Sequence, residues 1–191
     1  MKIVCIGDSI TFGYGIAKEY RWSEIVKNTL NINIINKGIN GDTTVGMLSR
    51  SYKDVILNKP DKVIIMGGTN DFIRGHSYKT VEKNILELTK EALHNKIQPI
   101  IGIQIPTYSQ LALKKWASSI NYDKVNEKIQ TYRQEIIEFT TKQNLKYIDF
   151  YKNFINECEL HNINEYYVDG IHPNKEGHKI MAQSAIKVLG V

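Results

Sequence analysis

Five short runs of almost continuously apolar residues constrain the fold of this chain more than any other feature. They are Lys2–Gly7, Ile32–Asn36, Lys62–Met66, Ile97–Ile103 and Leu145–Phe150. A strand with one face in water alternates apolar and polar residues, whereas a strand buried on both faces is apolar throughout. Strands of the second kind belong to parallel sheets that helices cover on both sides. The runs therefore predict a parallel sheet of about five strands.

Longer stretches with apolar residues at helical spacing separate these runs. They are Trp22–Leu30, Thr43–Leu57, Thr80–Asn95, Asn121–Gln143 and Asn174–Val188. Strict alternation of strand and helix with right-handed crossovers produces a doubly wound sandwich. We therefore predict an α/β fold, a flavodoxin-like three-layer α/β/α sandwich with strand order 2-1-3-4-5. The length of 191 residues suits a single domain over residues 1–191. The least regular stretches are Gly13–Arg21, Ile105–Ser119 and Glu157–Pro173.

Charge and composition narrow the classes of function. The net charge is +5, but the lysines are scattered and form no basic block. A solvated surface is therefore favoured over nucleic-acid binding. No apolar stretch approaches the roughly 18 residues of a membrane span, and the apolar start is too short for a signal peptide. Cys5 and Cys158 provide neither a zinc-ligand spacing nor a disulfide framework. A cytoplasmic location follows, with leaderless export as the alternative.

The residues just after the strands carry the functional information, because ligands of an open parallel sheet bind beyond the carboxyl ends of its strands. After the first run, residues 7–11 read Gly-Asp-Ser-Ile-Thr. This places Ser9 on the turn into a helix, where backbone N–H groups point toward any oxyanion formed beside it. After the second run, Gly41 permits close approach of its N–H to a ligand. Each motif alone also fits a helix cap or an ordinary turn.

Two further motifs follow the third and fifth runs. Residues 67–71 read Gly-Gly-Thr-Asn-Asp, and the amide of Asn70 is an uncharged donor suited to a developing oxyanion. Residues 169–173 read Asp-Gly-Ile-His-Pro. His172 can place Nδ1 on the carboxylate of Asp169, which leaves Nε2 to act as a base. Pro173 favours an extended His172 and suits the first position of the following helix.

Together the four motifs supply the groups that acyl transfer requires, on one edge of one sheet. Ser9 is the predicted nucleophile, His172 its base and Asp169 the carboxylate that orients the base. The N–H groups of Ser9 and Gly41 and the side-chain amide of Asn70 are the predicted oxyanion donors. The reaction needs no metal and no cofactor.

The same four blocks resemble those of the SGNH/GDSL hydrolases, a family named for a Ser, a Gly, an Asn and a His in separate blocks. Residues 7–11 resemble its nucleophile block, with Ile10 in place of Leu, and Gly41 falls at its oxyanion glycine. Residues 67–71 and 169–173 resemble its asparagine and Asp/His blocks. The resemblance spans residues 7 to 173 and implies a single SGNH hydrolase domain. It is strongest to the small thioesterase/lysophospholipase and arylesterase members.

The substrate is predicted only by class. We expect a serine esterase acting on small or medium-chain acyl esters, including thioesters or lysophospholipids, through an acyl-enzyme on Ser9. A carbohydrate O-deacetylase and an acyltransferase are alternatives that use the same site. The apolar stretch 105–119 either walls an acyl chain or packs on the core, and Tyr20 and Trp22 leave the same choice.

Two other classes of function stay open at this point. Asp8, Asn70, Asp71 and His172 could gather a divalent ion for a phosphoesterase, although the chain lacks a closely spaced Asp-x-His pair near its start. A flavodoxin-like sheet could instead bind a flavin or a phosphate group. Against this, the sequence has no P-loop and no complete Gly-x-Gly-x-x-Gly. A non-catalytic binding module also gives no chemical role to the pair Asp169 and His172.

Overall fold

A five-stranded parallel sheet forms the centre of the protein. The computed structural model describes the backbone of residues 1–160 and 162–190, and the side chains of these residues except 158–160. The sheet order is β2-β1-β3-β4-β5, and every neighbouring pair is parallel. The strands are β1 (Lys2–Gly7), β2 (Asn33–Gly38), β3 (Lys62–Met66), β4 (Gln98–Ile103) and β5 (Lys146–Asp149). The predicted α/β class and strand order 2-1-3-4-5 are confirmed.

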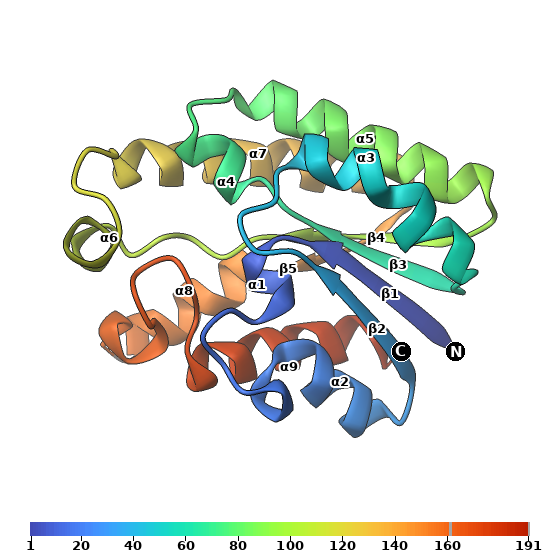
Figure 1. Cartoon of the computed structure of the whole chain (residues 1–191), viewed down its shortest axis with the longest axis horizontal. Helices are drawn as coiled ribbons and strands as arrows, with labels where there is room; N and C mark the ends of the chain where they lie inside the picture. Colours follow the sequence, from blue (N-terminus) through green and yellow to red (C-terminus); the bar gives the residue numbers. More distant parts are fainter. Residues whose placement is uncertain (161, 191) are drawn as a thin grey trace.

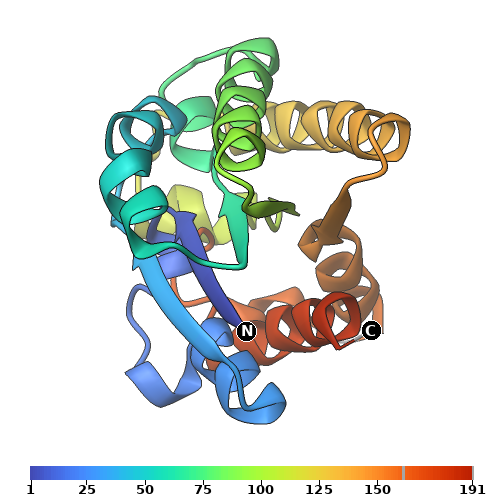
Figure 2. The same cartoon turned by 90° about the vertical axis from the view of Figure 1, so that its right-hand side faces the viewer.

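Helices cover both faces of the sheet and complete three layers (Figures 1 and 2). One face carries α1 (Ser9–Phe12), α2 (Trp22–Leu30), α8 (Phe150–Leu160) and α9 (Lys175–Leu189). The other face carries α3 (Thr44–Asp54), α4 (Thr69–Ile73), α5 (Tyr78–His94) and α7 (Tyr122–Lys142). The short helix α6 (Ser109–Lys115) lies beyond the carboxyl ends of the strands, at the left of Figure 1. The 3₁₀ turns are Lys18–Tyr20, Ile56–Asn58 and Ile163–Tyr166.

The central strands are buried on both faces, which explains their continuous apolar character. In β1, Ile3 and Cys5 pack into one hydrophobic cluster while Val4 and Ile6 pack into the other, and all four are fully buried. Burying a side chain of this size contributes about 1.5–3 kcal/mol. The second cysteine, Cys158, lies outside the described side chains.

Polar side chains cap the first turns of three helices: Ser77, Asn121 and Asn174 accept backbone N–H groups at the starts of α5, α7 and α9. The predicted starts at Asn121 and Asn174 are confirmed, whereas the helix predicted from Thr80 begins at Tyr78.

The stretch predicted to be mostly helical over Thr43–Leu57 contains α3, which ends at Asp54, and a 3₁₀ turn. Helix α8 was not predicted: it begins at Phe150, the last residue of the predicted strand run, and extends into the stretch Glu157–Pro173, predicted to be irregular. The stretch Ile105–Ser119, predicted to be irregular, contains α6.

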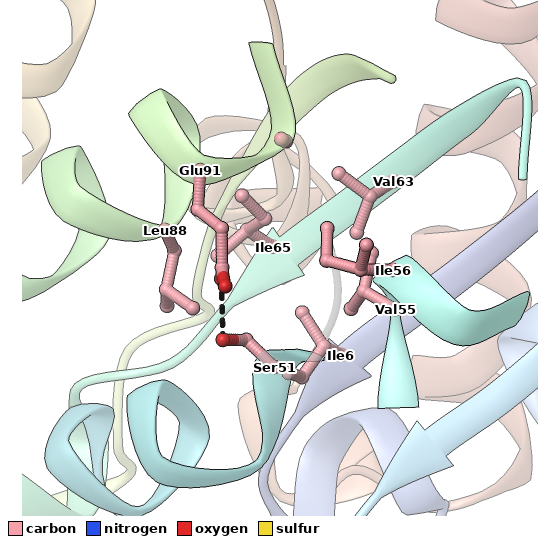
Figure 3. Close-up of a pocket in the computed structure, with 9 residues that line it drawn as sticks. Ile6, Ser51, Val55, Ile56, Val63, Ile65, Leu88 and Glu91 are labelled. Atoms are coloured by element: carbon pink, nitrogen blue, oxygen red, sulfur yellow. Dashed lines mark hydrogen bonds between the residues drawn. The ribbon is translucent and has the colours of Figure 1, made fainter. Parts of the chain in front are cut away.

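A small gap lies between α3, α5 and the sheet (Figure 3). Its volume is about 10 Å³, which is close to the minimum for one water molecule. Ser51 donates a hydrogen bond to Glu91 at its edge. None of its lining residues belongs to the four sequence motifs, so this gap is a packing defect and not a substrate site.

Among residues 1–160 and 162–190, no helix combines the length and the apolar composition needed to cross a bilayer.

Candidate active site

Ser9, His172 and Asp169 come together at the carboxyl edge of the sheet. β1 ends at Gly7, and Asp8 caps α1 by accepting the Ile10 N–H at 2.9 Å, so Ser9 takes the first position of the helix. His172 Nε2 lies 2.9 Å from Ser9 Oγ, although the two residues are 163 positions apart. His172 Nδ1 lies 2.8 Å from Asp169 Oδ2. The carboxylate must accept from Nδ1–H, which leaves Nε2 to accept the Ser9 hydroxyl proton.

Asp169 is held as a carboxylate by its surroundings. Burial alone would raise its pKa, but hydrogen bonds from the His172 ring and from two backbone N–H groups keep the pKa below its usual range. Those N–H groups belong to Ile171 and His172, and both reach Asp169 Oδ1, at 3.0 and 2.9 Å. Asp169 is therefore charged at neutral pH and able to stabilise a protonated imidazole.

The three predicted oxyanion donors line the same cavity as the hydroxyl of Ser9. The Ser9 N–H has no intrahelical acceptor because Ser9 opens α1. Gly41 adopts φ +75°, and a Cβ there would meet nothing within 4 Å, so its backbone conformation and not crowding favours glycine. Asn70 Nδ2 donates to the Asp42 carbonyl at 2.9 Å, which fixes the amide and leaves its second N–H for a ligand.

The cavity at this site has a volume of about 280 Å³. This lies just below the range of about 300–1,000 Å³ typical of ligand pockets. Its walls are Ser9, Tyr14, Asn40, Gly41, Asn70, Ile73, Trp116, Ile171 and His172. Every predicted site residue except Asp169 therefore faces the cavity, and Asp169 lies behind the imidazole. The space suits a small acyl group.

The apolar stretch 105–119 was considered either as a wall for an acyl chain or as part of the core, and its residues do both. Most of its large apolar side chains pack on the core, namely Ile105, Tyr108 and Leu111. Only Trp116 of this stretch lines the cavity. Trp22 is fully buried and donates its Nε1–H to the Ile10 carbonyl, so it belongs to the core. Tyr20 lies outside the cavity, with the Lys175 ammonium 4.0 Å from its ring centroid.

A buried hydrogen-bond network that sequence reasoning missed holds the helix that carries Asn70. Asp71, fully buried, accepts the Thr44 N–H at 3.0 Å and the Thr44 hydroxyl at 2.8 Å. Asn84 donates to the same hydroxyl at 2.9 Å. These bonds tie α4, which carries Asn70, to the start of α3. In the sequence, the position of Asp71 next to Asn70 in one motif could have indicated its part in this network. Nothing in the sequence around Asn84 indicated a role for that residue.

Asp8 and Asp71, considered above as metal ligands, make hydrogen bonds to the backbone instead. Burial raises the pKa of Asp8 to about 6, against the opposing effect of the Ile10 N–H. Within the described part of the chain, no group of three or more His, Cys, Asp or Glu side chains has a geometry that could hold a metal ion. The donors named for a phosphoesterase therefore do not converge.

Comparison with known proteins agrees with this geometry. The chain matches the family model described as "GDSL-like Lipase/Acylhydrolase family" over residues 5–180. An arylesterase of Vibrio mimicus is 27% identical over 98% of this chain and 90% of its own length. An acetylxylan esterase of Geobacillus stearothermophilus is 26% identical over 99% of this chain and 94% of its own length.

Solved structures show the same likeness across the whole chain. A lipolytic protein of the G-D-S-L family from Veillonella parvula superposes with a TM-score of 0.86 at 26% identity, covering 100% of this chain and 98% of that one. A putative lipolytic protein of the same family from Desulfitobacterium hafniense has a TM-score of 0.83 at 28% identity, with 98% and 99% covered. The resemblance inferred from four short motifs is confirmed: the chain belongs to the GDSL-like lipase/acylhydrolase family.

Proposed function

We propose that this protein is a serine esterase that hydrolyses small or medium-chain carboxylic esters through an acyl-enzyme on Ser9. The observation that carries the proposal is the hydrogen-bonded series from Asp169 through His172 to Ser9, with contacts of 2.8 and 2.9 Å. Three oxyanion donors beside the same hydroxyl support it. A nucleophile, an oriented base and preorganised donors are the groups that ester cleavage requires.

In the proposed reaction Ser9 Oγ attacks the ester carbonyl while His172 Nε2 takes the hydroxyl proton. The negative charge on the carbonyl oxygen is held by the N–H groups of Ser9 and Gly41 and the amide of Asn70. The imidazolium, stabilised by Asp169, returns the proton to the leaving oxygen as the ester bond breaks. Water then attacks the acyl-enzyme with His172 as base, and the acid is released.

The cavity volume of about 280 Å³ favours short acyl groups over long ones. The names of the relatives support a carboxylic ester as the substrate: an arylesterase, an acetylxylan esterase, and the esterase TesA of Pseudomonas aeruginosa, 27% identical over 54% of this chain. A carbohydrate O-deacetylase is the second candidate, supported by the acetylxylan esterase relative. An acyltransferase would use the same acyl-enzyme. The cytoplasmic location and the single domain over residues 1–191 stay predictions.

The test is hydrolysis of a chain-length series of p-nitrophenyl esters by the wild type and by Ser9→Ala. Loss of a triad nucleophile lowers kcat by about 10⁶. Ser49→Ala, which removes an exposed hydroxyl that bonds only the Gly46 carbonyl, serves as the matched control and should keep full activity. A fluorophosphonate probe should label Ser9 alone. Wild-type rates in Ser9→Ala, or labelling of another residue, would refute the proposal.

A further inference from the structure

Two aromatic side chains stand at the mouth of the cavity, where the structure leaves them open to solvent. Tyr14 is 39% exposed and Trp116 is 50% exposed. Their ring centroids lie 6.5 Å apart with the planes nearly perpendicular. Both rings also pack on the His172 imidazole, at centroid distances of 4.5 Å for Tyr14 and 5.2 Å for Trp116. The base is therefore flanked by a pair of aromatic rings, Tyr14 and Trp116, which we call the aromatic pair.

The position of Tyr14 is set by the backbone of the nucleophile turn. Its N–H donates to the Ser9 carbonyl at 3.0 Å. The neighbouring residues Gly13 and Gly15 adopt φ +83° and +73°, a left-handed conformation that glycine adopts without strain. The turn therefore returns directly over the helix that starts with Ser9, which brings the Tyr14 ring to the imidazole.

The position of Trp116 is set by the loop that carries the base. Trp116 follows α6, and its N–H donates to the Ala112 carbonyl at 2.8 Å. Ala112 is fully buried, and its backbone approaches Gly170 so closely that a Cβ at Gly170 would lie 2.4 Å from the Ala112 nitrogen. The Tyr108 N–H also donates to the Gly170 carbonyl at 2.7 Å. The helix that presents Trp116 is thus anchored on the turn between Asp169 and His172.

Among the apolar residues that line the cavity, solvent exposure distinguishes the aromatic pair. Ile171 is buried and Ile73 is partly buried, and both belong to the small cluster around Ala112. Half-exposed rings add little to core packing, yet both of these rings contact the His172 imidazole. Large aromatic faces left in water beside a reactive centre are typical of ligand contact surfaces.

The chemistry of the imidazole decides which half of the substrate the aromatic pair would meet. His172 returns its proton to the leaving oxygen, so the leaving group must lie against the imidazole. The carbonyl oxygen is directed to the donors Gly41 and Asn70. We propose that Tyr14 and Trp116 form a leaving-group subsite that selects ring-shaped alcohols, phenols or pyranoses, whose flat face packs on one of the two perpendicular rings while the edge meets the other. This inference rests on the proposed esterase function and names its substrate class.

The experiment compares three acetate esters that share one acyl group: phenyl acetate, a methyl O-acetyl-xylopyranoside and ethyl acetate. Trp116→Ala and Tyr14→Ala should each lower kcat/KM on at least one ring ester, through KM, about fivefold or more beyond their effect on ethyl acetate. Trp116→Phe and Tyr14→Phe keep an aromatic ring and should retain most of the preference for ring esters over ethyl acetate. Tyr52→Ala, an exposed tyrosine that does not line the cavity, is the matched control. The two ring esters distinguish a phenol from a sugar.

An equal loss on ethyl acetate, or no loss on either ring ester, would overturn the subsite. A wild type that hydrolyses no ester would refute the esterase function. In that case the binding of ring compounds to the aromatic pair has to be measured without catalysis. Trp116 fluorescence provides it, because the second tryptophan, Trp22, is fully buried. A fluorescence change on titration with methyl xylopyranoside or cyclohexanol, weakened in Tyr14→Ala, supports the subsite. No change with either ring compound overturns it.

Discussion

Replacing Arg50 by Met tests how strand β1, which leads into Ser9, and the loop that carries Gly41 are held together. Arg50 Nη2 donates to the Gly7 carbonyl at 2.9 Å, two residues before the proposed nucleophile Ser9. Arg50 Nη1 donates to the Lys37 carbonyl at 2.8 Å, and Nε to Asp42 Oδ2 at 2.7 Å. Asp42 directly follows Gly41. One guanidinium therefore joins both sides of the site, and Met retains its apolar stem but none of its donors.

The cost to stability follows from the burial of the ion pairs. The side chains of Arg50, Asp42 and Asp54 are only 14%, 12% and 13% exposed. Removing one partner of a buried pair costs about 3–5 kcal/mol. Lys37 stays 3.3 Å from Asp54 and compensates part of this, so we expect a loss of about 2–4 kcal/mol. For a chain of this size that lowers Tm by roughly 5–15 °C.

The same variant reports on Asp54. Burial raises the pKa of Asp54, but hydrogen bonds from Arg50 and Lys37 outweigh burial and keep the pKa below its usual value. This carboxylate therefore adds stability above the pKa it has in the unfolded chain, and the stability is lost as pH falls through the lower folded pKa. In Arg50→Met this part of the pH dependence should shrink.

Activity separates a positioning role from a purely structural one. A looser Gly7 and Asp42 should lower kcat roughly tenfold or more, because small displacements of reacting groups are costly. Arg133→Met is the matched control: it removes a comparable ion pair to Asp149, with side chains 22% and 14% exposed, away from the cavity. We expect Arg133→Met to lower Tm but keep kcat. A Tm within about 2 °C of wild type in Arg50→Met, or equal kcat losses in both variants, would refute this reasoning.

Three other predictions concern the donor, the base loop and pH. Asn70→Ala should lower kcat by about 10²–10³ with little change in KM, measured by steady-state kinetics, as loss of one oxyanion donor does; an unchanged kcat contradicts that role. Gly170→Ala should lose roughly 2–4 kcal/mol in urea unfolding, because φ is +89° and the Cβ would collide with the backbone of α6. Gly75→Ala, with the same φ and open space around it, should lose less, and equal losses would exclude the collision. Burial lowers the pKa of His178 from 6.5 to about 4, so the unfolded chain binds the extra proton. The stability this ring contributes is present above pH 6.5 and falls as pH drops toward 4, by about 3 kcal/mol. In urea unfolding at several pH values, the free energy of unfolding of His178→Gln should depend less on pH than that of the wild type. Equal pH dependence in the two proteins would contradict this role of His178.

Much of the site was predictable because its chemistry is local in sequence. Ser9, Gly41, Asn70 and His172 each follow a strand, and the carboxyl ends of parallel strands share one edge of the sheet. The supporting groups were not predictable in this way. Arg50 stands in the middle of α3 like any solvated helix residue, and only the folded chain brings four acceptors around it.

The aromatic pair shows the same limit. Tyr14 stands between two glycines in a stretch without regular pattern, and Trp116 stands in a stretch where most other apolar residues pack on the core. Nothing in the local sequence distinguishes a ring at the cavity mouth from a ring in the core. Their contacts with His172 join segments that are far apart in the chain, so only tertiary structure reveals them.

The sequence by itself determined the sheet, its order and the four sequence blocks that meet at the cavity, because burial on both faces and turn chemistry depend on neighbouring residues. Tertiary structure decided α6, the shape of the cavity and the partners of Arg50. The physical reason is that a seven-residue helix is not stable alone in water. α6 forms because Ala112 packs with Tyr122, at the start of the next helix, and with Ile171, which arrives from a distant part of the chain. Where the stability of an element comes from long-range contacts, the local sequence pattern does not predict that element.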